Sequence, residues 1–240
     1  MKLLIGVVTS GKHRYCLDQV QLSVEKQSQK ADSLFVVPKG ESAYATLLKS
    51  RKLNAVEDLN FASSDADKAM RARKFIRKHA LDNGYDAVLF IEGDIVVPGR
   101  GLEFLQSTLG DVIAGAYLNV FEIDGKQTIA PVLYRDECNG NAKQLTYEGA
   151  AVPKVMQIGA AGFGCVLVRR KALEAIDFRA MNEKGNDSIA FFVDARAKGF
   201  SCLANTGVHC LHLVYPITDE RARLFEWRKK VADTSQDLHL

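Results

Sequence analysis

Short apolar runs that alternate with amphipathic helical patterns constrain the fold of this 240-residue chain more than any other feature. Residues 3–8 form the first apolar run, and residues 33–37, which stop at a Pro-Lys-Gly turn, form the second. Between them, residues 15–30 carry three apolar side chains at helical spacing. Two strands joined by a helix make a βαβ unit, so we expect an α/β fold with a mainly parallel central sheet.

Further patterns continue this alternation and end in a more irregular section. The expected elements are helices over residues 66–81 and 101–109, a strand over 112–116, an antiparallel section over 128–168, helices over 172–176 and 187–198, a strand over 200–204 and a helix over 218–231. Ser64 or Asp65 is placed to cap the helix over 66–81. The chain shows no repeat or long linker, so we expect a single compact unit.

A pair of carboxylates follows the most apolar of these runs. Residues 85–91 predict a buried central strand, which ends in Glu92-Gly93-Asp94. Ligands of open α/β sheets bind beyond the carboxyl ends of the strands. A buried carboxylate needs a cation or a partner, and Mg²⁺ or Mn²⁺ would complete its shell with water and substrate phosphate oxygens. Gly93 would let a phosphate approach the backbone. An ordinary acidic turn would give the same pattern.

Two histidines, His209 and His212, follow a predicted strand near the C-terminus. Imidazole suits Mn²⁺ better than Mg²⁺. Either histidine could fold back to complete a metal site beside the carboxylates, and either could equally be a hydrogen-bonded core residue.

Two glycine patterns bear on nucleotide binding. Residues 159–164 read Gly-x-x-Gly-x-Gly, the reverse of the dinucleotide fingerprint, and they precede a strand, which argues against a Rossmann site. These small residues either let a sugar lie against the backbone or make a tight turn. The first strand leads into a near match to the P-loop, but His13 replaces the required hydroxyl residue and Gly6 falls within the strand. Lys12 or Arg14 remains a candidate for phosphate contact.

Composition narrows the class of protein. The formal charge of +3, from 32 basic and 29 acidic residues, is too balanced to indicate a nucleic-acid partner. The five cysteines include no C-x-x-C pair, so a disulfide framework or thiolate zinc site is not indicated, and a reducing, cytoplasmic location is expected. No stretch approaches the roughly 18 apolar residues of a membrane span, so any membrane contact would be peripheral.

Taken together, these segments resemble the GT-A glycosyltransferases, particularly the inverting, family-2-like members. The resemblance rests on the order of six segments: strand 3–9, the basic helix that contains Arg73, the run 85–98 with its acidic motif, segment 159–170, helix 187–199 and His212. It covers residues 1 to about 212. It implies one GT-A domain over 1–240, with a nucleotide-binding half of about 1–98, an acceptor-side half of about 99–216 and a C-terminal helix of about 217–240.

The resemblance also implies a substrate and a set of site residues. In that family the acidic motif binds a divalent metal and the nucleotide-diphosphate sugar, which implies Mn²⁺ or Mg²⁺ here. The residues expected to bind the donor are Thr9, Lys12, Arg73, Glu92 and Asp94. The implied metal ligands are Glu92, Asp94 and His212. Thr9 stands where the family contacts the nucleoside, and Glu92 departs from the family's aspartate by one methylene.

The family's catalytic base lies in an E-D-x-x-F motif at the start of a helix. If Phe191 and Gly199 set the register, Ser188 falls where the family's Asp belongs and Asp187 falls on the preceding Glu. We expect Asp187 to take the proton from the acceptor hydroxyl in an inverting transfer. Asp187 is equally suited to complement the helix dipole, and a retaining transfer would need no such base.

The expected C-terminal helix carries Leu224, Trp227 and Val231 on one side among several basic residues. That face either packs onto the domain or lies on an anionic membrane, which would suit a lipid-linked acceptor. The acceptor itself is not indicated. Two other functions share the fold: a sugar nucleotidyltransferase, and a module that binds a nucleotide sugar or glycan without turnover.

Overall fold

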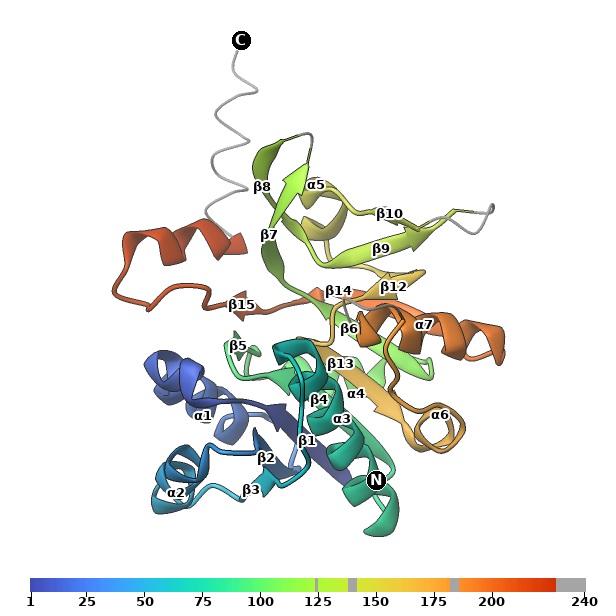
Figure 1. Ribbon diagram of the computed structural model, residues 1–240. Coiled ribbons are helices and arrows are strands. Elements are labelled where there is room, and N and C mark those ends of the chain that lie inside the picture. Colours follow the sequence, from blue (N-terminus) through green and yellow to red (C-terminus); the bar gives the residue numbers. More distant parts are fainter. Residues whose placement is uncertain (124, 138–141, 182–185, 228–240) are drawn as a thin grey trace.

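The computed structural model describes residues 1–123, 125–137, 142–181 and 186–227. This part of the chain contains an eight-stranded sheet with helices on both faces (Figure 1). Its strands, in spatial order, are β11 (Val155–Gln157), β14 (Cys202–His209), β6 (Val112–Ala116), β13 (Cys165–Arg169), β4 (Ala87–Glu92), β1 (Leu3–Val8), β2 (Asp32–Pro38) and β3 (Ala55–Asp58). Only β13 and β11 run antiparallel to their neighbours, which confirms the expected mainly parallel sheet.

Alternate residues of the strands bury two apolar layers, one on each face of the sheet. Leu3, Ile5 and Val7 of β1 pack into the layer that is covered by η1 (Gly11–Cys16), α1 (Leu17–Glu25), α2 (Ser42–Ser50) and α4 (Gly101–Ser107). Leu4 and Val8 pack into the layer beneath α3 (Asp65–Asp82), α6 (Arg170–Ala175) and α7 (Asp187–Ala197). The period of two in the strand therefore sets which helices share a core.

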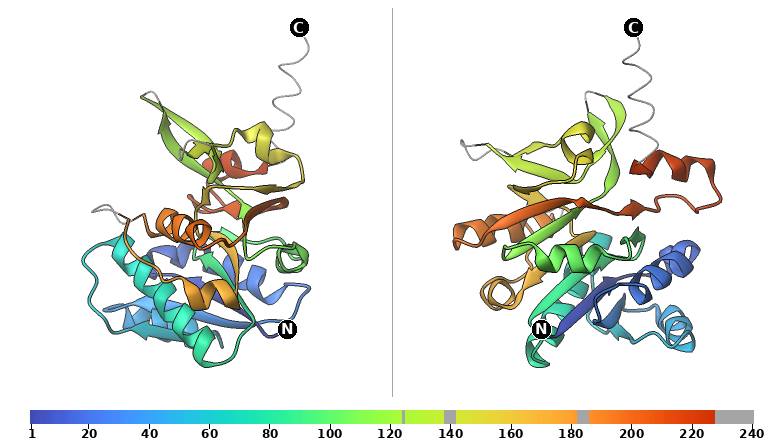
Figure 2. Two further views of the ribbon diagram at one scale, coloured as in Figure 1. Left: turned by 90° about the vertical axis from the view of Figure 1, so that its right-hand side faces the viewer. Right: turned by 180° about the vertical axis from the view of Figure 1, so that it is seen from behind.

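A smaller antiparallel layer lies beyond the carboxyl edge of the large sheet (Figure 2). It consists of β7 (Leu118–Ile123) with β8 (Lys126–Pro131), β9 (Leu133–Asp136) with β10 (Ala142–Gln144) and β12 (Ala160–Ala161), and α5 (Tyr147–Ala151). The two-residue strand β5 (Ile95–Val96) pairs with β15 (Leu211–His212), so the chain just after Asp94 meets the chain near the described C-terminal end. The expected antiparallel section is confirmed.

Two predicted helices differ from the structure, and two elements were not predicted. The helix expected over 15–30 is a 3-10 turn followed by α1, and α2 and β3 were not predicted. The helix expected from residue 218 is wrong over its described part, which is η2 (Glu220–Phe225) followed by an extended Glu226 at φ −80° and ψ 125°. This break lets Phe225 and Trp227 both be buried, whereas a continuous helix would have turned one of them outward. Val231 and the basic residues from 228 onward lie outside the described residues. None of the described helices is both long and apolar enough to cross a bilayer.

Candidate functional site

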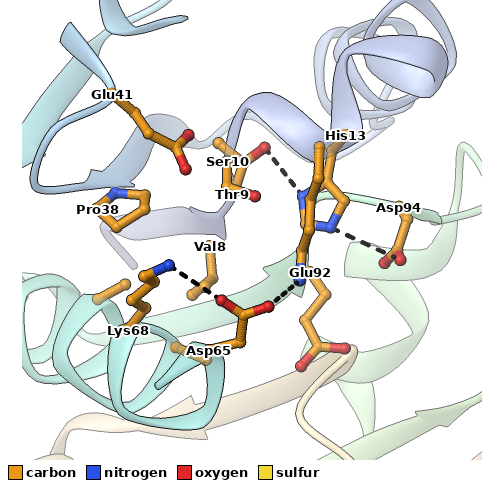
Figure 3. Close-up of a pocket in the computed structure, with 13 residues that line it drawn as sticks. Val8, Thr9, Ser10, His13, Pro38, Glu41, Asp65, Lys68, Glu92 and Asp94 are labelled. Carbon is orange, nitrogen blue, oxygen red and sulfur yellow. Dashed lines mark hydrogen bonds and ion pairs between the residues drawn. The ribbon is translucent and has the colours of Figure 1, made fainter. Parts of the chain in front are cut away.

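A cavity of about 420 Å³ opens at the carboxyl ends of β1, β2 and β4 (Figure 3). Thr9, Lys12, Glu92 and Asp94 all line it, which brings together four of the five residues expected to bind the donor. Parallel strands end at the same edge of a sheet, so residues that follow separate strands converge there. Arg73 does not line the cavity but lies behind Glu92.

The turn Glu92-Gly93-Asp94 is fixed by backbone and side-chain packing. The Gly93 N–H donates to the Val8 carbonyl at 2.8 Å. A Cβ at Gly93 would lie 2.5 Å from both His13 Nδ1 and Thr9 Oγ1. Thr9, which follows β1, and His13 of η1 therefore fill the space where a side chain would lie, so close packing requires a glycine here; its role in letting a phosphate approach stays a prediction.

Arg73 of α3 links two acidic residues of the candidate site, Glu92 and Asp187. Its Nη1 donates to both oxygens of Asp187, at 2.8 and 2.7 Å, and its Nη2 donates to Glu92 Oε1 at 2.5 Å. Arg73 is 2% exposed and Asp187 6%. Burial acts to lower the pKa of Arg73, but the charges of Asp187 and Glu92 outweigh it and raise that pKa. Burial raises the pKa of Glu92 although Arg73 opposes it.

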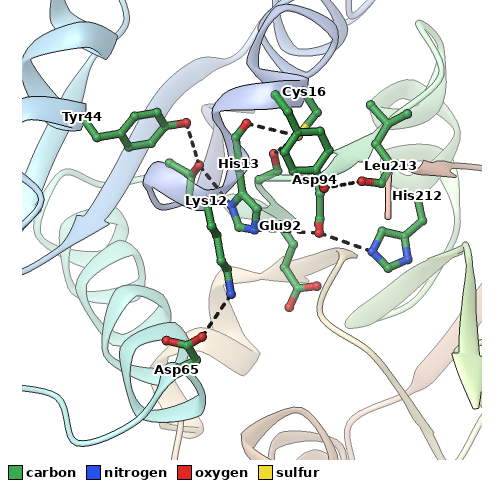
Figure 4. Close-up of polar contacts among 12 residues, drawn as sticks. Lys12, His13, Cys16, Tyr44, Asp65, Glu92, Asp94, His212 and Leu213 are labelled. Atoms are coloured by element: carbon green, nitrogen blue, oxygen red, sulfur yellow. Dashed lines mark hydrogen bonds and ion pairs between the residues drawn. The ribbon is translucent and has the colours of Figure 1, made fainter. Parts of the chain in front are cut away.

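Asp94 lies between two imidazoles (Figure 4). Its Oδ2 is 3.4 Å from His212 Nε2 and 3.8 Å from His13 Nε2. Burial acts to raise the pKa of Asp94. The hydrogen bond and the charge of His212 outweigh burial, so the pKa of Asp94 is lowered overall. Burial acts to lower the pKa of His212, but Asp94 raises it overall, whereas burial prevails at His13 and lowers its pKa.

The structure separates the two C-terminal histidines. His212 Nδ1 donates to the Leu118 carbonyl at 2.8 Å, which leaves Nε2 facing Asp94. His209 instead stacks on Trp227 with ring centroids 4.1 Å apart, and its Nε2 lies 3.0 Å from the Ala150 carbonyl. Only His212 of this pair is therefore near the acidic turn, and His209 packs the described end of the chain.

Asp187 is the first residue of α7, after Asn186 in the left-handed conformation at φ 48°. Both of its carboxylate oxygens accept from Arg73, and α7 has no side-chain capping hydrogen bond; Asp187 still lies in the first turn, where a carboxylate complements the helix dipole. Ser188, which takes the register position of the family's Asp, is the next residue of the same helix.

Solved structures that are similar to this chain include glycosyltransferases and nucleotidyltransferases. TarS of S. aureus in complex with UDP matches with a TM-score of 0.55 and 14% identity over 87% of this chain and 60% of that chain. GalNAc-T7 with UDP, GalNAc and Mn²⁺ matches with a TM-score of 0.62 and 11% identity over 91% and 44%. The inositol-1-phosphate CTP transferase from T. maritima matches with a TM-score of 0.51 and 11% identity over 97% of each chain.

The fold is that of the nucleotide-diphospho-sugar transferases. At these identities the likeness shows the fold alone. The chain spans only 60% of the compared TarS chain and 44% of the GalNAc-T7 chain. No protein-family model matches the sequence, and no curated protein matches it significantly.

Asp94 and His212 offer atoms of the kind that bind a divalent cation. Among the described residues, no three His, Cys, Asp or Glu side chains form a group that could hold a metal ion by itself. Asp94 offers a carboxylate, and His212, once deprotonated, offers the lone pair of Nε2 because Nδ1 keeps its proton for Leu118. Mg²⁺ and its relatives are commonly held by one or two protein groups plus substrate phosphates. Glu92 Oε1 accepts from Arg73, and its role as a further metal ligand stays a prediction.

Several residues around the cavity were not singled out by the sequence. His13 was noted only as a misfit to the P-loop, yet it packs on Gly93 and lies beside Asp94. Asp65, expected only as a helix cap, accepts from Lys12 at 3.4 Å and from Lys68 at 3.1 Å, so three charged groups share the rim. Tyr44 of α2 lies 3.2 Å from Thr9 Oγ1. Tyr44 could have been found only if helix α2 had been predicted, because the apolar face of α2 covers β2.

Proposed function

We propose that this protein is a glycosyltransferase that moves a sugar from a nucleotide-diphosphate sugar to an acceptor hydroxyl, with a divalent cation held at Asp94. One observation supports this most directly: Asp94 lines the cavity at the ends of β1, β2 and β4, and Nε2 of the buried His212 lies 3.4 Å from Asp94 Oδ2. Such a crevice beyond the carboxyl ends of parallel strands is where nucleotides bind in open α/β sheets.

In this proposal the nucleoside occupies the cavity and the diphosphate lies toward Asp94. Thr9 is buried and is held by Tyr44, so it presents a fixed hydroxyl at the end of β1. Lys12 is on the rim with its side chain 60% exposed, and its contact with Asp65 is a weak surface pair that a phosphate could replace. Thr9 and Lys12 orient the donor. Glu92 contributes to this orientation indirectly, through its contact with Arg73.

Asp94 and His212 would hold Mn²⁺ or Mg²⁺, and the cation would supply charge stabilisation to the departing diphosphate. A site with one imidazole and one carboxylate favours Mn²⁺ over Mg²⁺, because imidazole is the softer ligand. A metal ion could bind His212 Nε2 only when that nitrogen carries no proton. Without metal, the contact between His212 and Asp94 takes the place of the two metal–ligand bonds.

Asp187 is the proposed base for an inverting transfer. Arg73 fixes both of its oxygens, which sets the direction of the carboxylate before any acceptor arrives. A carboxylate in that position would take the proton from the acceptor hydroxyl as it attacks the anomeric carbon.

The first experiment measures the thermal midpoint of the protein with UDP-, GDP-, CDP- and ADP-linked sugars in Mn²⁺, Mg²⁺ or EDTA. A ligand present at 100 times its dissociation constant adds about 2.7 kcal/mol to the free energy of unfolding. We expect one nucleotide to stabilise the protein only when metal is present, and we expect Asp94→Ala to abolish that shift. Asp86→Ala is the matched control, since Asp86 lies at the opposite end of the same strand and bonds the Lys2 N–H.

A sugar nucleotidyltransferase is the second candidate, favoured by the nearly end-to-end match with the CTP transferase. The two reactions release different products. Slow donor breakdown to a free nucleoside diphosphate would support sugar transfer, whereas pyrophosphate released from a nucleoside triphosphate would support nucleotidyl transfer. Metal-dependent binding without either product would indicate a binding module, and no shift with any nucleotide would refute the donor site.

A further inference from the structure

The glycine-rich segment 159–164 is a sequence motif that has no role in the proposed donor site. Gly162 and Gly164 both pack against Tyr117, a buried residue that directly follows β6. A Cβ at Gly162 would lie 2.0 Å from Tyr117 Oη, and a Cβ at Gly164 would lie 2.7 Å from Tyr117 Cζ. Neither glycine has a positive φ, so the space around them requires glycine and the backbone conformation does not. The two glycines form a seat for one aromatic ring.

Tyr117 in turn contacts His212. The two rings meet edge to face, with centroids 5.6 Å apart and an interplanar angle of 89°. The next residue, Leu118, supplies the carbonyl that accepts from His212 Nδ1 at 2.8 Å. One short stretch of chain therefore fixes the imidazole twice, through a backbone hydrogen bond and through an aromatic contact. The nitrogen left over, Nε2, faces Asp94.

The buried environment of Tyr117 argues against its hydroxyl as a general base. Burial raises the pKa of Tyr117 well above its usual range, and the nearby charge of Glu92 acts in the same direction. A phenol that stays protonated cannot take a proton from a substrate at neutral pH. Its contribution is to geometry.

We infer that Tyr117 is a positioning residue that holds the His212 imidazole with Nε2 toward Asp94, and that residues 162 and 164 are glycines because they make its seat. This inference rests on the proposed function, in which His212 is a metal ligand. Groups that orient a metal-binding imidazole commonly change metal affinity by about 10- to 100-fold when they are removed.

The first test measures the dissociation constant for Mn²⁺ by titration calorimetry. Tyr117→Leu removes the ring and is expected to weaken Mn²⁺ binding by about tenfold or more, whereas Tyr117→Phe keeps the ring and should stay within about twofold of wild type. Gly110→Ala controls for general disturbance of the core, because its Cβ would press on Leu203 at 2.7 Å at the amino end of β6. Equal Mn²⁺ affinity in wild type and Tyr117→Leu would overturn the inference.

A second test uses rescue within the seat. Gly162→Ala should weaken Mn²⁺ binding, since the added methyl group pushes on the Tyr117 hydroxyl. Removing that hydroxyl in Gly162→Ala/Tyr117→Phe should restore part of the lost affinity, which makes the two changes non-additive. In a His212→Ala background, Tyr117→Leu should cause no further loss. Additive losses of Mn²⁺ affinity in either pair of changes would contradict the inference that Tyr117 acts through His212.

A metal-free readout separates this inference from the proposed function. At a pH where the His212 imidazole is neutral, nitrogen-15 NMR of its side chain should show the Nδ1–H tautomer in wild type. Tyr117→Leu should give a mixture of tautomers, because without the ring contact the imidazole can turn out of line with the Leu118 carbonyl. If wild type binds no Mn²⁺ while this difference is present, the proposed metal site is wrong and the positioning role stands. An unchanged tautomer in Tyr117→Leu overturns the positioning role itself.

Discussion

Both carboxylate oxygens of Asp187 lie within hydrogen-bond distance of one nitrogen of Arg73, Nη1, although 114 positions separate the two residues in the sequence. The other guanidinium nitrogen, Nη2, reaches Glu92. A single side chain on α3 therefore joins the first residue of α7 to the last residue of β4. This link couples the stability of the fold to the arrangement of the site.

Replacing Arg73 by Met should destabilise the protein by about 3–5 kcal/mol, because it leaves Asp187 and Glu92 as uncompensated, largely buried charges that face each other. Urea unfolding would measure the loss. Arg71→Met is the matched control on the same helix, and since Arg71 pairs with Asp67 at the surface it should cost less than about 1 kcal/mol. Similar losses for both variants would show that the buried ion pairs of Arg73 contribute no more to stability than the surface ion pair of Arg71.

Replacing Asp187 by Asn should lower the turnover number by about 10²- to 10⁴-fold and leave donor affinity within a few-fold, because the amide keeps a hydrogen-bonding oxygen for Arg73 but cannot accept the acceptor's proton. Steady-state kinetics with the donor found by thermal shift would test this. Asp194→Asn on the same helix is the control, as its partner Arg179 is exposed. Retained turnover in Asp187→Asn would point to a different base or to a retaining transfer.

Replacing Gly93 by Ala should cost about 1–3 kcal/mol, the usual effect of overpacking, because the added methyl group collides with His13 and Thr9. It should also weaken the nucleotide-induced thermal shift, since Thr9 lines the cavity. Gly11→Ala makes only an ordinary contact, 3.4 Å from Glu41 Oε2, and should change stability by less than about 0.5 kcal/mol. A neutral Gly93→Ala would mean that the two side chains move aside freely.

Glu103 provides a pH-dependent prediction away from the site. Its hydrogen bonds from Arg100 and Ser28 lower the pKa of Glu103 to about 2. A depressed pKa contributes stability that is present above the unfolded-state pKa of about 4.3 and is lost as the pH falls toward 2. Glu103→Gln should therefore be less stable than wild type at pH 7, and the gap should narrow between pH 4.5 and 3. A gap that stays constant over that range would rule out this linkage.

Much of the fold could be predicted from local pattern. The apolar runs at 3–8, 85–91 and 112–116 are strands because each is short, nearly uninterrupted and bounded by turn residues, and Ser64 caps α3 as expected. The segment 42–58 escaped because α2 has no capping hydrogen bond and β3 is only four residues long and ends in two acidic residues. Their identity depends on packing against β2, which is a tertiary effect.

The residues of the candidate site could be proposed one by one from the sequence, but their contacts could not. The acidic turn, Arg73, Asp187 and His212 each came from a motif or from the resemblance, while the Arg73 clamp and the placement of His13 beside Asp94 depend on how separate βαβ units stack. The resemblance favoured His212 over His209, but the residue pattern alone did not separate them, because both come after the strand predicted over 200–204. The choice is decided by the stack of Trp227 on His209 and by the Leu118 carbonyl at His212.

The reversed strand β13 has a consequence for synthesis of the protein. It lies between β4 and β6 in the sheet, yet the ribosome makes it after both of them and after the whole smaller layer. Until Cys165–Arg169 emerges, β4 and β6 each carry an unpaired edge in the middle of the future sheet, and such edges invite pairing with other chains. A growing chain stalled between residues 116 and 165 should therefore depend on chaperones more than the completed chain does.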